Sequence, residues 1–113
     1  MRMNKQTPAA VKKSISPLRI HYIIKTGSQN IGWFNLRKPF DSTIGMFGMI
    51  IDKPFQGQGF GQEAMKLIKQ EAKKIGIKKL LLEVESKNFK AINLYVGFGF
   101  KATRRFIEME KKI

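Results

Sequence analysis

At residues 56–61 the chain reads Gln56-Gly57-Gln58-Gly59-Phe60-Gly61, between an apolar segment (44–51) and a segment with helical periodicity (60–75). The apolar segment has the length and composition of a buried β-strand. The helical segment carries one apolar face, made of Phe60, Ala64, Leu67, Ile68 and Ile75. A glycine-rich turn between a strand and a helix presents backbone N–H groups at the positive end of the helix dipole. The sequence therefore predicts a phosphate-binding loop that includes Gln62.

Two common phosphate loops fit this stretch less well. The Walker loop requires Gly-Lys-Ser/Thr, but Gly61 is followed by Gln62 and Glu63. The Rossmann fingerprint is G-x-G-x-x-G, whereas the glycines here are spaced by two. Glu83 lies near the distance at which a Rossmann unit places its acidic residue. Spacing alone therefore leaves that alternative open, and with it a plain turn that only redirects the chain.

A second motif lies at residues 88–98, where Asn88-x-x-Ala91-Ile92-x-Leu94-Tyr95 is followed by Gly97-Phe98. Together with Gln56-x-x-Gly59-x-Gly61, this motif resembles the two cofactor segments of the GNAT superfamily of acyl-CoA-dependent N-acyltransferases. The resemblance spans about residues 20–111. It implies an α/β (α+β) fold with a mixed, mostly antiparallel central sheet flanked by helices, in which splayed strands hold the cofactor.

The same resemblance implies that acetyl-CoA (coenzyme A) is the cofactor and indicates which residues bind it. These are Met49, Ile50 and Ile51 on the strand, Gln56, Gly57, Gln58, Gly59, Phe60, Gly61 and Gln62 in the loop, and Asn88 and Ala91 downstream. Contacts from the strand are expected to come from main-chain groups, so an ordinary core strand is compatible with this role. Asn88 is also a candidate helix N-cap.

Two catalytic residues follow from the resemblance. Tyr95 is the implied general acid that protonates the departing thiolate, and the alternative is a core tyrosine. Many family members carry a glutamate on the strand before the loop, but residues 44–51 contain none. Glu83 is a candidate base, because Leu-Glu-Val ahead of Asn88 resembles the branch that acetylates protein N-termini. An ordinary surface glutamate, His21 and a water chain remain as alternatives.

The other elements are expected in family order, as a single domain over residues 1–113 with a shortened N-terminal segment (1–17). Expected strands cover residues 2–6, 18–25, 31–37, 79–85 and 100–110, and the alternative for the last is two strands joined by a tight turn near Arg104-Arg105. A short helix opens at Thr7-Pro8 and runs to Ser14, and Pro17 ends it. A second short helix covers residues 88–96 and is capped by Gly97. The family normally has longer helices after its first strand. Their loss should expose apolar surface and favour a homodimer.

Composition limits the remaining possibilities. The chain has no cysteine, which excludes disulfides, thiolate metal sites and an acyl-cysteine intermediate, and no metal site is expected. The N-terminus contains no apolar run, so we expect neither a signal peptide nor membrane association. We therefore expect a cytoplasmic protein. The net charge of +14 should help to capture anionic coenzyme A. It also permits a ribosomal or nucleic-acid partner.

The resemblance thus predicts an N-acetyltransferase that moves an acetyl group from acetyl-CoA to an amine by direct transfer in a ternary complex. The acceptor classes are a protein N-terminus, a polyamine or a small amine. Two alternatives remain: a catalytically silent CoA-binding domain of the same fold, and a basic accessory module that binds ribosomal or nucleic-acid partners.

Overall fold

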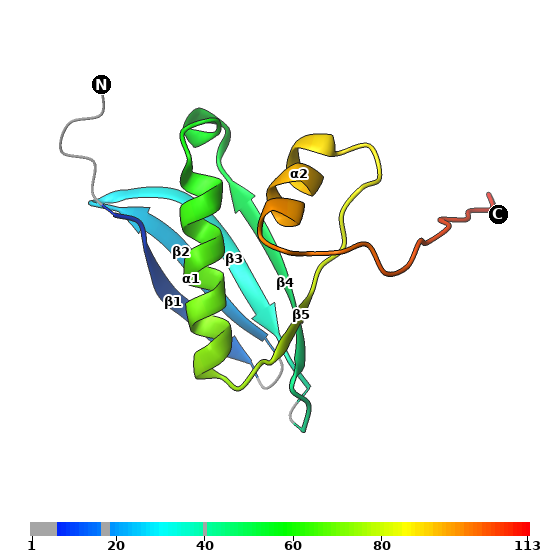
Figure 1. Ribbon diagram of the computed structural model, residues 1–113, viewed down its shortest axis with the longest axis horizontal. Helices are drawn as coiled ribbons and strands as arrows, with labels where there is room; N and C mark the ends of the chain where they lie inside the picture. The colour runs from blue at the N-terminus through cyan, green and yellow to red at the C-terminus, as the bar shows by residue number, and fades with distance from the viewer. Residues whose placement is uncertain (1–6, 17–18, 40) are drawn as a thin grey trace.

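The computed structural model describes residues 7–16, 19–39 and 41–113, and the strand expected at residues 2–6 and the stop at Pro17 lie outside this part. Figure 1 shows the arrangement of the elements. In chain order they are β1 (Ala9–Ser16), β2 (Arg19–Thr26), β3 (Gln29–Arg37), β4 (Ile44–Ile51), the 3₁₀ turn η1 (Lys53–Phe55), α1 (Phe60–Lys74), β5 (Lys79–Leu81) and α2 (Phe89–Gly97).

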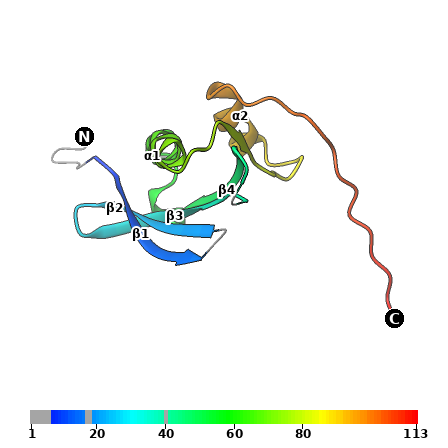
Figure 2. The same cartoon turned by 90° about the horizontal axis from the view of Figure 1, so that it is seen from below.

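The five strands form one sheet in the order β1-β2-β3-β4-β5. The first three pairings are antiparallel, and only β4 and β5 run parallel. Helices α1 and α2 lie on the same side of this sheet, and the other side carries no helix from the described residues (Figure 2). The mixed, mostly antiparallel sheet with flanking helices confirms the expected fold class.

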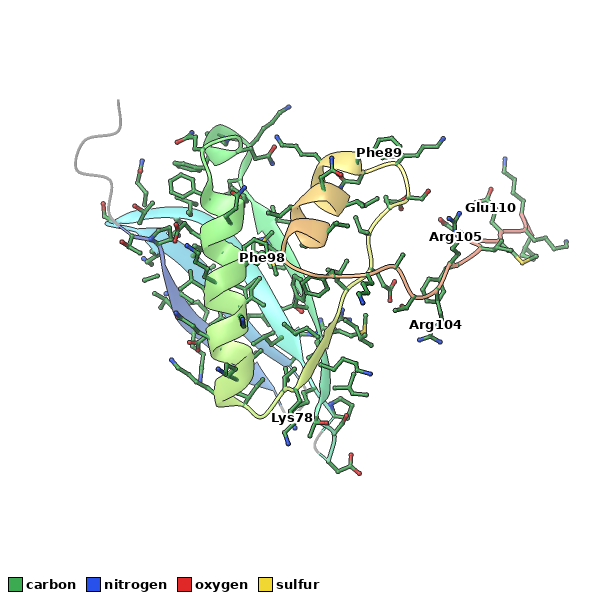
Figure 3. All side chains as sticks on the ribbon, viewed as in Figure 1. Lys78, Phe89, Phe98, Arg104, Arg105 and Glu110 are labelled. Carbon is green, nitrogen blue, oxygen red and sulfur yellow. The ribbon has the colours of Figure 1, made fainter. Side chains whose placement is uncertain are left out.

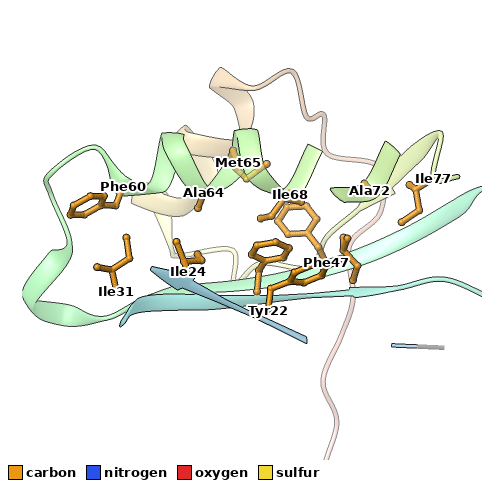
Figure 4. Packing of buried hydrophobic residues seen from close by; sticks show 12 residues of the cluster. Tyr22, Ile24, Ile31, Phe47, Phe60, Ala64, Met65, Ile68, Ala72 and Ile77 are labelled. Atoms are coloured by element: carbon orange, nitrogen blue, oxygen red, sulfur yellow. The ribbon is translucent and has the colours of Figure 1, made fainter. Parts of the chain in front are cut away.

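The core lies between the inner face of the sheet and α1 (Figure 4). Tyr22 of β2 stacks on Phe34 of β3, with ring centroids 4.4 Å apart, and Ile68 of α1 is fully buried. Trp33 is 36% exposed, whereas the neighbouring Phe34 is fully buried. The period-two alternation therefore places Trp33 and Phe34 on opposite faces of β3.

Helix α1 has nearly the predicted bounds, and its C-terminus explains how the chain returns to the core. The Gly76 N–H donates to the Lys73 carbonyl at 3.1 Å, and the Ile77 N–H donates to the Ala72 carbonyl at 3.0 Å. These two bonds form a Schellman motif, in which the residue after the glycine contacts the last helical turn. Ile77 and Ala72 are both buried, so the stop signal and the core packing act together.

The helix expected from Thr7-Pro8 to Ser14 is wrong, because Ala9–Ser16 forms strand β1. Val11 pairs with Ile23, and the ladder continues to the end of the strand with one register shift, between Lys12 and Ser14. The local cap signal offered hydrogen bonds for a single turn, whereas pairing with β2 satisfies backbone groups along the whole segment. The tertiary ladder therefore prevails.

Two expected strands also differ from the structure. β5 ends at Leu81 instead of residue 85, because its ladder with β4 covers only three pairs, the last being Met46 with Leu81. Residues 100–110 form no strand in the described chain, and residues 101–113 are exposed throughout. Figures 1 and 2 show this C-terminal tail running away from the sheet and helices. In this conformation the tail pairs with no strand of the described chain.

Candidate active site

The loop after β4 is held down by its own glutamines. The Gln56 side-chain amide donates to the Ile51 carbonyl at 2.8 Å, and the Gln58 side-chain amide donates to the Pro54 carbonyl at 3.0 Å. The Asp52 N–H donates to the Ile31 carbonyl of β3 at 2.8 Å. These bonds fix the loop to the sheet and to η1. The glutamine side chains of the motif therefore stabilise the shape of the loop. The surface that the loop presents is its backbone.

Gly57 and Gly59 give this loop its open surface. Their φ angles are 75° and 84°, in the left-handed region that side-chain-bearing residues rarely adopt. A Cβ atom at either position would meet nothing within 4 Å. Backbone at both positions is thus open to close approach by a ligand, and a side chain would occupy that space.

Gly59 is also the N-cap of α1 and provides no side-chain cap. The helical ladder begins where the Glu63 N–H donates to the Gly59 carbonyl at 3.3 Å. The first helical turn precedes this bond, so its backbone N–H groups lie at the positive end of the helix, next to the loop. This arrangement fits the pyrophosphate of coenzyme A, because it combines backbone donors, the positive helix end and open space.

The third glycine of the motif has a different role, which is packing. A Cβ atom at Gly61 would lie 3.2 Å from Cδ2 of Leu94 on α2. Its absence allows α2 to approach the first turn of α1. The two sequence motifs are therefore in direct contact, although more than thirty residues separate Gly61 from Leu94 in the chain.

Strands β4 and β5 diverge beside this loop. Their last pair is Met46 with Leu81, whereas β4 continues to Ile51 and remains paired with β3 on its other side. From Phe47 onward, the β4 edge that faces away from β3 has no strand partner among the described residues. Met49 and Ile51 are half-buried, and Ile50 is 49% exposed. Main-chain groups along this edge are thus available to an extended ligand.

Helix α2 begins at an asparagine cap and is followed by a left-handed glycine, Gly99, that the sequence analysis did not single out. Asn88 is its N-cap, and the side-chain oxygen accepts from the Ala91 N–H at 3.3 Å. Gly97 is the last helical residue, not the cap as expected; Gly99, with φ of 92°, takes the left-handed position. The Phe100 N–H then donates to the Tyr95 carbonyl at 3.1 Å. This is a second Schellman motif, and it fixes the last turn that carries Tyr95.

Tyr95 lies at the point where the two strands part. Its ring packs edge-on against Phe47, the first β4 residue beyond the last β5 pair, with centroids 5.8 Å apart. Phe100 completes the cluster, 5.9 Å from Tyr95 and 5.8 Å from Phe47. Burial raises the pKa of Tyr95 above its ordinary value of 10.0. The hydroxyl therefore stays protonated at neutral pH, as a proton donor must.

The candidate bases belong to other elements than this cluster. Glu83 is exposed, two residues beyond the end of β5, and no contact recorded among the described residues connects it with Tyr95. His21 is half-buried on β2 and pairs with Asn35 of β3. The structure thus brings together the loop, the β4 edge and Tyr95.

Sequence reasoning missed the two phenylalanines that hold Tyr95 in place. Phe47 looked like one more apolar residue of a buried strand, and Phe100 was assigned to a strand that does not form. A signal for Phe100 was present, because an apolar residue directly after a left-handed glycine often packs back on the helix that it follows.

The family comparison covers most of the chain. The model of the acetyltransferase (GNAT) family matches residues 5–100. In the structure, this range contains the whole sheet, α1, the glycine-rich loop and α2 through Phe100. No helix in the described ranges is long and apolar enough to cross a membrane.

Individual relatives agree with this assignment over part of their length. The chain is 36% identical over 61 residues to the uncharacterized N-acetyltransferase YycN of Bacillus subtilis, which covers 54% of this chain and 38% of YycN. It is 36% identical over 55 residues to the [ribosomal protein bS18]-alanine N-acetyltransferase of Escherichia coli K12, which covers 49% of this chain and 37% of that enzyme. The matched segments therefore span well under half the length of these two curated relatives.

Solved structures extend the likeness to the fold. The crystal structure of YycN has a TM-score of 0.74 at 26% identity, over 87% of this chain and 64% of that one. A GNAT acetyltransferase from Elizabethkingia anophelis, solved with acetyl-CoA bound, has a TM-score of 0.70 at 26% identity, over 76% of this chain and 56% of that one. From the family match and this shared architecture, the chain belongs to the acetyltransferase (GNAT) family.

Proposed function

We propose that this chain is an N-acetyltransferase that moves an acetyl group from acetyl-CoA to an amine by direct transfer in a ternary complex. One observation carries the proposal: an open glycine loop at the start of α1 lies at one end of the unpaired β4 edge, and Tyr95 lies at the other end. An extended acyl-CoA needs such a site, with a cradle for its phosphates and a proton donor at its sulfur.

The binding roles follow from the groups that are open. Backbone N–H groups of residues 57–62 would hold the pyrophosphate, because the helix dipole and the φ of Gly59 direct donors at an anion. Main-chain groups of Met49, Ile50 and Ile51 would pair with the amides of the pantetheine arm, in the way that an added strand pairs with a sheet edge. The Asn88 side chain is already engaged as the N-cap of α2, so its contribution would be to position that helix.

The reaction needs a proton donor and a proton acceptor. Acetyl-CoA supplies an activated thioester; the amine nitrogen attacks its carbonyl carbon, a C–N bond forms and the C–S bond breaks. Tyr95 would donate its hydroxyl proton to the departing sulfur, because this hydroxyl, whose pKa is raised by burial, is protonated at neutral pH. The amine proton would leave to Glu83, His21 or water. Direct transfer is consistent with the absence of cysteine from the chain.

The acceptor that we favour is the α-amine of a protein N-terminus. The E. coli relative is named for acetylating an alanine of a ribosomal protein, and its matched segment covers 49% of this chain. A polycationic acceptor such as a polyamine is disfavoured by the net charge of +14, since like charges repel. Substrates with a single amine avoid most of this repulsion.

The proposal is tested by the release of free coenzyme A, measured with a thiol reagent. The protein itself gives no background, because it has no cysteine. An N-terminal alanine peptide, spermidine and a small primary amine are compared as acceptors, and we expect the peptide to give the fastest release. The variants Glu83→Gln and His21→Gln then test which group is the base. A loss of rate in one variant identifies the replaced residue as the base. If neither variant loses rate, the proton acceptor is water.

Two outcomes would point to the alternatives. Thermal stabilisation by acetyl-CoA without turnover on any acceptor would identify a silent CoA-binding domain. Stabilisation by an RNA duplex but not by acetyl-CoA would identify a basic accessory module and overturn the proposal.

A further inference from the structure

The outer face of the sheet, opposite α1 and α2, carries no helix from the described residues (Figure 2). Strand register places four apolar residues side by side across this face, one from each of β1 to β4: Val11, Ile23, Trp33 and Ile50. Trp33 is 36% exposed and Ile50 is 49% exposed. Large apolar groups gathered in this way usually mark an interaction surface. We call these four residues the apolar row.

The charge on this face has one sign. None of the eight Asp and Glu residues of the chain lies in the described strands β1–β5. Arg19 and Arg37 are direct partners in the ladder between β2 and β3, on the same face as Trp33, and Lys25 lies on that face beyond the other side of the apolar row. Like charges directly opposite one another destabilise a sheet, and a bound anion would remove that cost. The outer face therefore favours an anionic partner.

Two polar side chains on this face carry atoms without partners. Asn35 lies between Trp33 and Arg37 on the outward side of β3. The Asn35 Oδ1 atom and the Arg37 Nε atom are buried and have no hydrogen-bond partner among the described residues. A Cβ atom at Gly48 of β4 would lie 3.3 Å from Asn35 Nδ2, so the Asn35 amide extends across the outer face. Because unsatisfied polar groups are costly, we expect a ligand that both donates and accepts hydrogen bonds here.

The three features together define the chemistry of the ligand. Arg37 requires an acceptor, Asn35 Oδ1 requires a donor, and the apolar row requires a flat apolar surface. An acidic helix or an anionic lipid surface supplies the anion and the apolar surface, but its carboxylates or phosphates are acceptors only. A nucleotide supplies all three, with phosphate oxygens, donors on the base edge and the 2′-hydroxyl, and a ring that stacks on an aromatic side chain.

The spacing along β3 favours a single strand. Trp33, Asn35 and Arg37 occupy successive outward positions, about 7 Å apart at about 3.4 Å per residue. Bases in a duplex are paired and stacked on one another, so they are not free to lie on a protein ring. An extended single strand can place a base on Trp33 while its phosphates follow the strand toward Arg37.

We propose that the outer face of the sheet binds single-stranded RNA. One base stacks on Trp33, the Asn35 amide bonds a base edge or a 2′-hydroxyl, and phosphates lie at the pair formed by Arg19 and Arg37. The glycine loop proposed for acetyl-CoA leads into α1, which covers the inner face of the sheet. The two ligands therefore bind at separate places, and this inference does not depend on the proposed acetyl transfer.

Trp33 is the only tryptophan of the chain, so tryptophan fluorescence reports directly on the outer face. We expect a short uridine oligomer to quench this emission in a saturable way, and the affinity to fall as salt rises. A saturating concentration of acetyl-CoA should leave the quenching unchanged. Absence of quenching would overturn the proposal. Competition by acetyl-CoA would also overturn it, because the RNA would then occupy the glycine loop.

A charge variant locates the phosphates. Arg37→Gln should weaken binding and lower the slope of log affinity against log salt by about 0.7, the value for one phosphate contact with a single strand. The matched control is Arg105→Gln, which removes the same charge from the tail, away from the sheet (Figure 3). It should leave the slope unchanged. Equal effects of the two variants would show that the RNA responds only to net charge, and the proposal would fail.

A second variant tests stacking. Trp33→Leu keeps an apolar side chain in the row but removes the aromatic ring. Binding of a labelled uridine oligomer, followed by anisotropy, should weaken at least roughly tenfold. Phe106→Leu removes an exposed ring from the tail and should bind as the parent does. Parental affinity in Trp33→Leu would contradict the stacked base and overturn the proposal.

Further probes separate the rival occupants of this face. The duplex of the uridine oligomer with an adenosine oligomer, and a deoxyuridine oligomer, should both bind more weakly than the RNA single strand. Equal affinity for the duplex would overturn the site, and equal affinity for the DNA oligomer would overturn the assignment to RNA. A blue shift of Trp33 emission with phosphatidylglycerol vesicles, in place of quenching by RNA, would assign the face to a lipid surface. A change with protein concentration alone would assign it to a second copy of the chain.

Discussion

The Tyr95 ring of α2 packs edge-on against Phe47 of β4, with the two centroids 5.8 Å apart, at the first residue beyond the last pair between β4 and β5. This contact places a half-buried hydroxyl-bearing side chain where the sheet opens. The Schellman motif at Gly99 holds the other side of Tyr95 through Phe100. The proposed proton donor is thus fixed from two directions by ordinary packing.

Replacing Tyr95 with Phe should lower acetyl transfer by about 10²–10⁴-fold, because it removes the proton donor but keeps the ring and its packing. Binding of acetyl-CoA should change little, since the hydroxyl acts mainly as the C–S bond breaks. Turnover and cofactor affinity are measured in parallel. Turnover near the parental value would refute the assignment, and a joint loss of binding would indicate a structural tyrosine.

The pH dependence of turnover offers a second view of Tyr95. Burial raises its pKa above 10.0, so the protonated form predominates throughout the neutral range and beyond it. We expect no loss of turnover attributable to an acid group between pH 7 and about 10. The measurement is the pH profile of kcat in parent and Tyr95→Phe, and a parental decline in kcat with an apparent pKa below 9, absent from the variant, would contradict the prediction.

Gly99 and Gly97 form a matched pair at the end of α2. Neither would place a Cβ near other atoms, but only Gly99 has a positive φ, of 92°. Gly99→Ala should therefore lower the free energy of unfolding by about 1 kcal/mol and reduce turnover through a displaced Tyr95. Gly97→Ala, in helical backbone, should be neutral or slightly stabilising. Chemical denaturation of the two variants checks this, and equal losses would argue against the Schellman motif as the constraint.

Alkaline pH should destabilise the fold through Tyr22. Burial, followed by the negative charge of Glu71, raises the pKa of Tyr22 from 10.0 to about 12. The folded state thus holds this proton more tightly than the unfolded state. The resulting stability is present below pH 10 and is lost as pH rises toward 12. Denaturant unfolding of parent and Tyr22→Phe should differ by an amount that is constant below pH 10. Above it, the parent should lose on the order of 2 kcal/mol relative to the variant. A constant difference at all pH values would exclude this linkage.

Much of the fold could be predicted from the sequence where local and tertiary signals agree. The bounds of β4 are as predicted, and α1 ends within one residue of its prediction, because strand composition, helical periodicity and the stop at Gly76 all coincide there. The loop between them is a glycine-rich turn in which Gly57 and Gly59 both adopt positive φ.

The wrong predictions fall where local sequence signals and tertiary pairing disagree. Thr7-Pro8 carries a strong local helix signal, but the segment that follows pairs with β2, a choice that only the tertiary ladder makes. Leu82–Glu85 and residues 100–110 have strand-like composition, yet a strand requires a partner, and composition cannot supply one. In the site, the sequence motif predicts the position of Tyr95 on its helix. The contacts of Tyr95 with Phe47 and Phe100 could not be predicted, because they depend on how α2 packs on β4.

The central claim is that acetyl-CoA binds through the glycine loop at the start of α1. Its most direct test is calorimetric titration of acetyl-CoA into the parent, Gly59→Glu and Gln70→Glu. Gly59→Glu puts bulk and negative charge into the open cradle, whereas Gln70→Glu adds the same charge on an exposed part of α1 outside the loop. We predict binding to the parent and to Gln70→Glu with similar affinity, and no detectable binding to Gly59→Glu. Equal affinity for all three proteins would show that the cofactor site lies elsewhere.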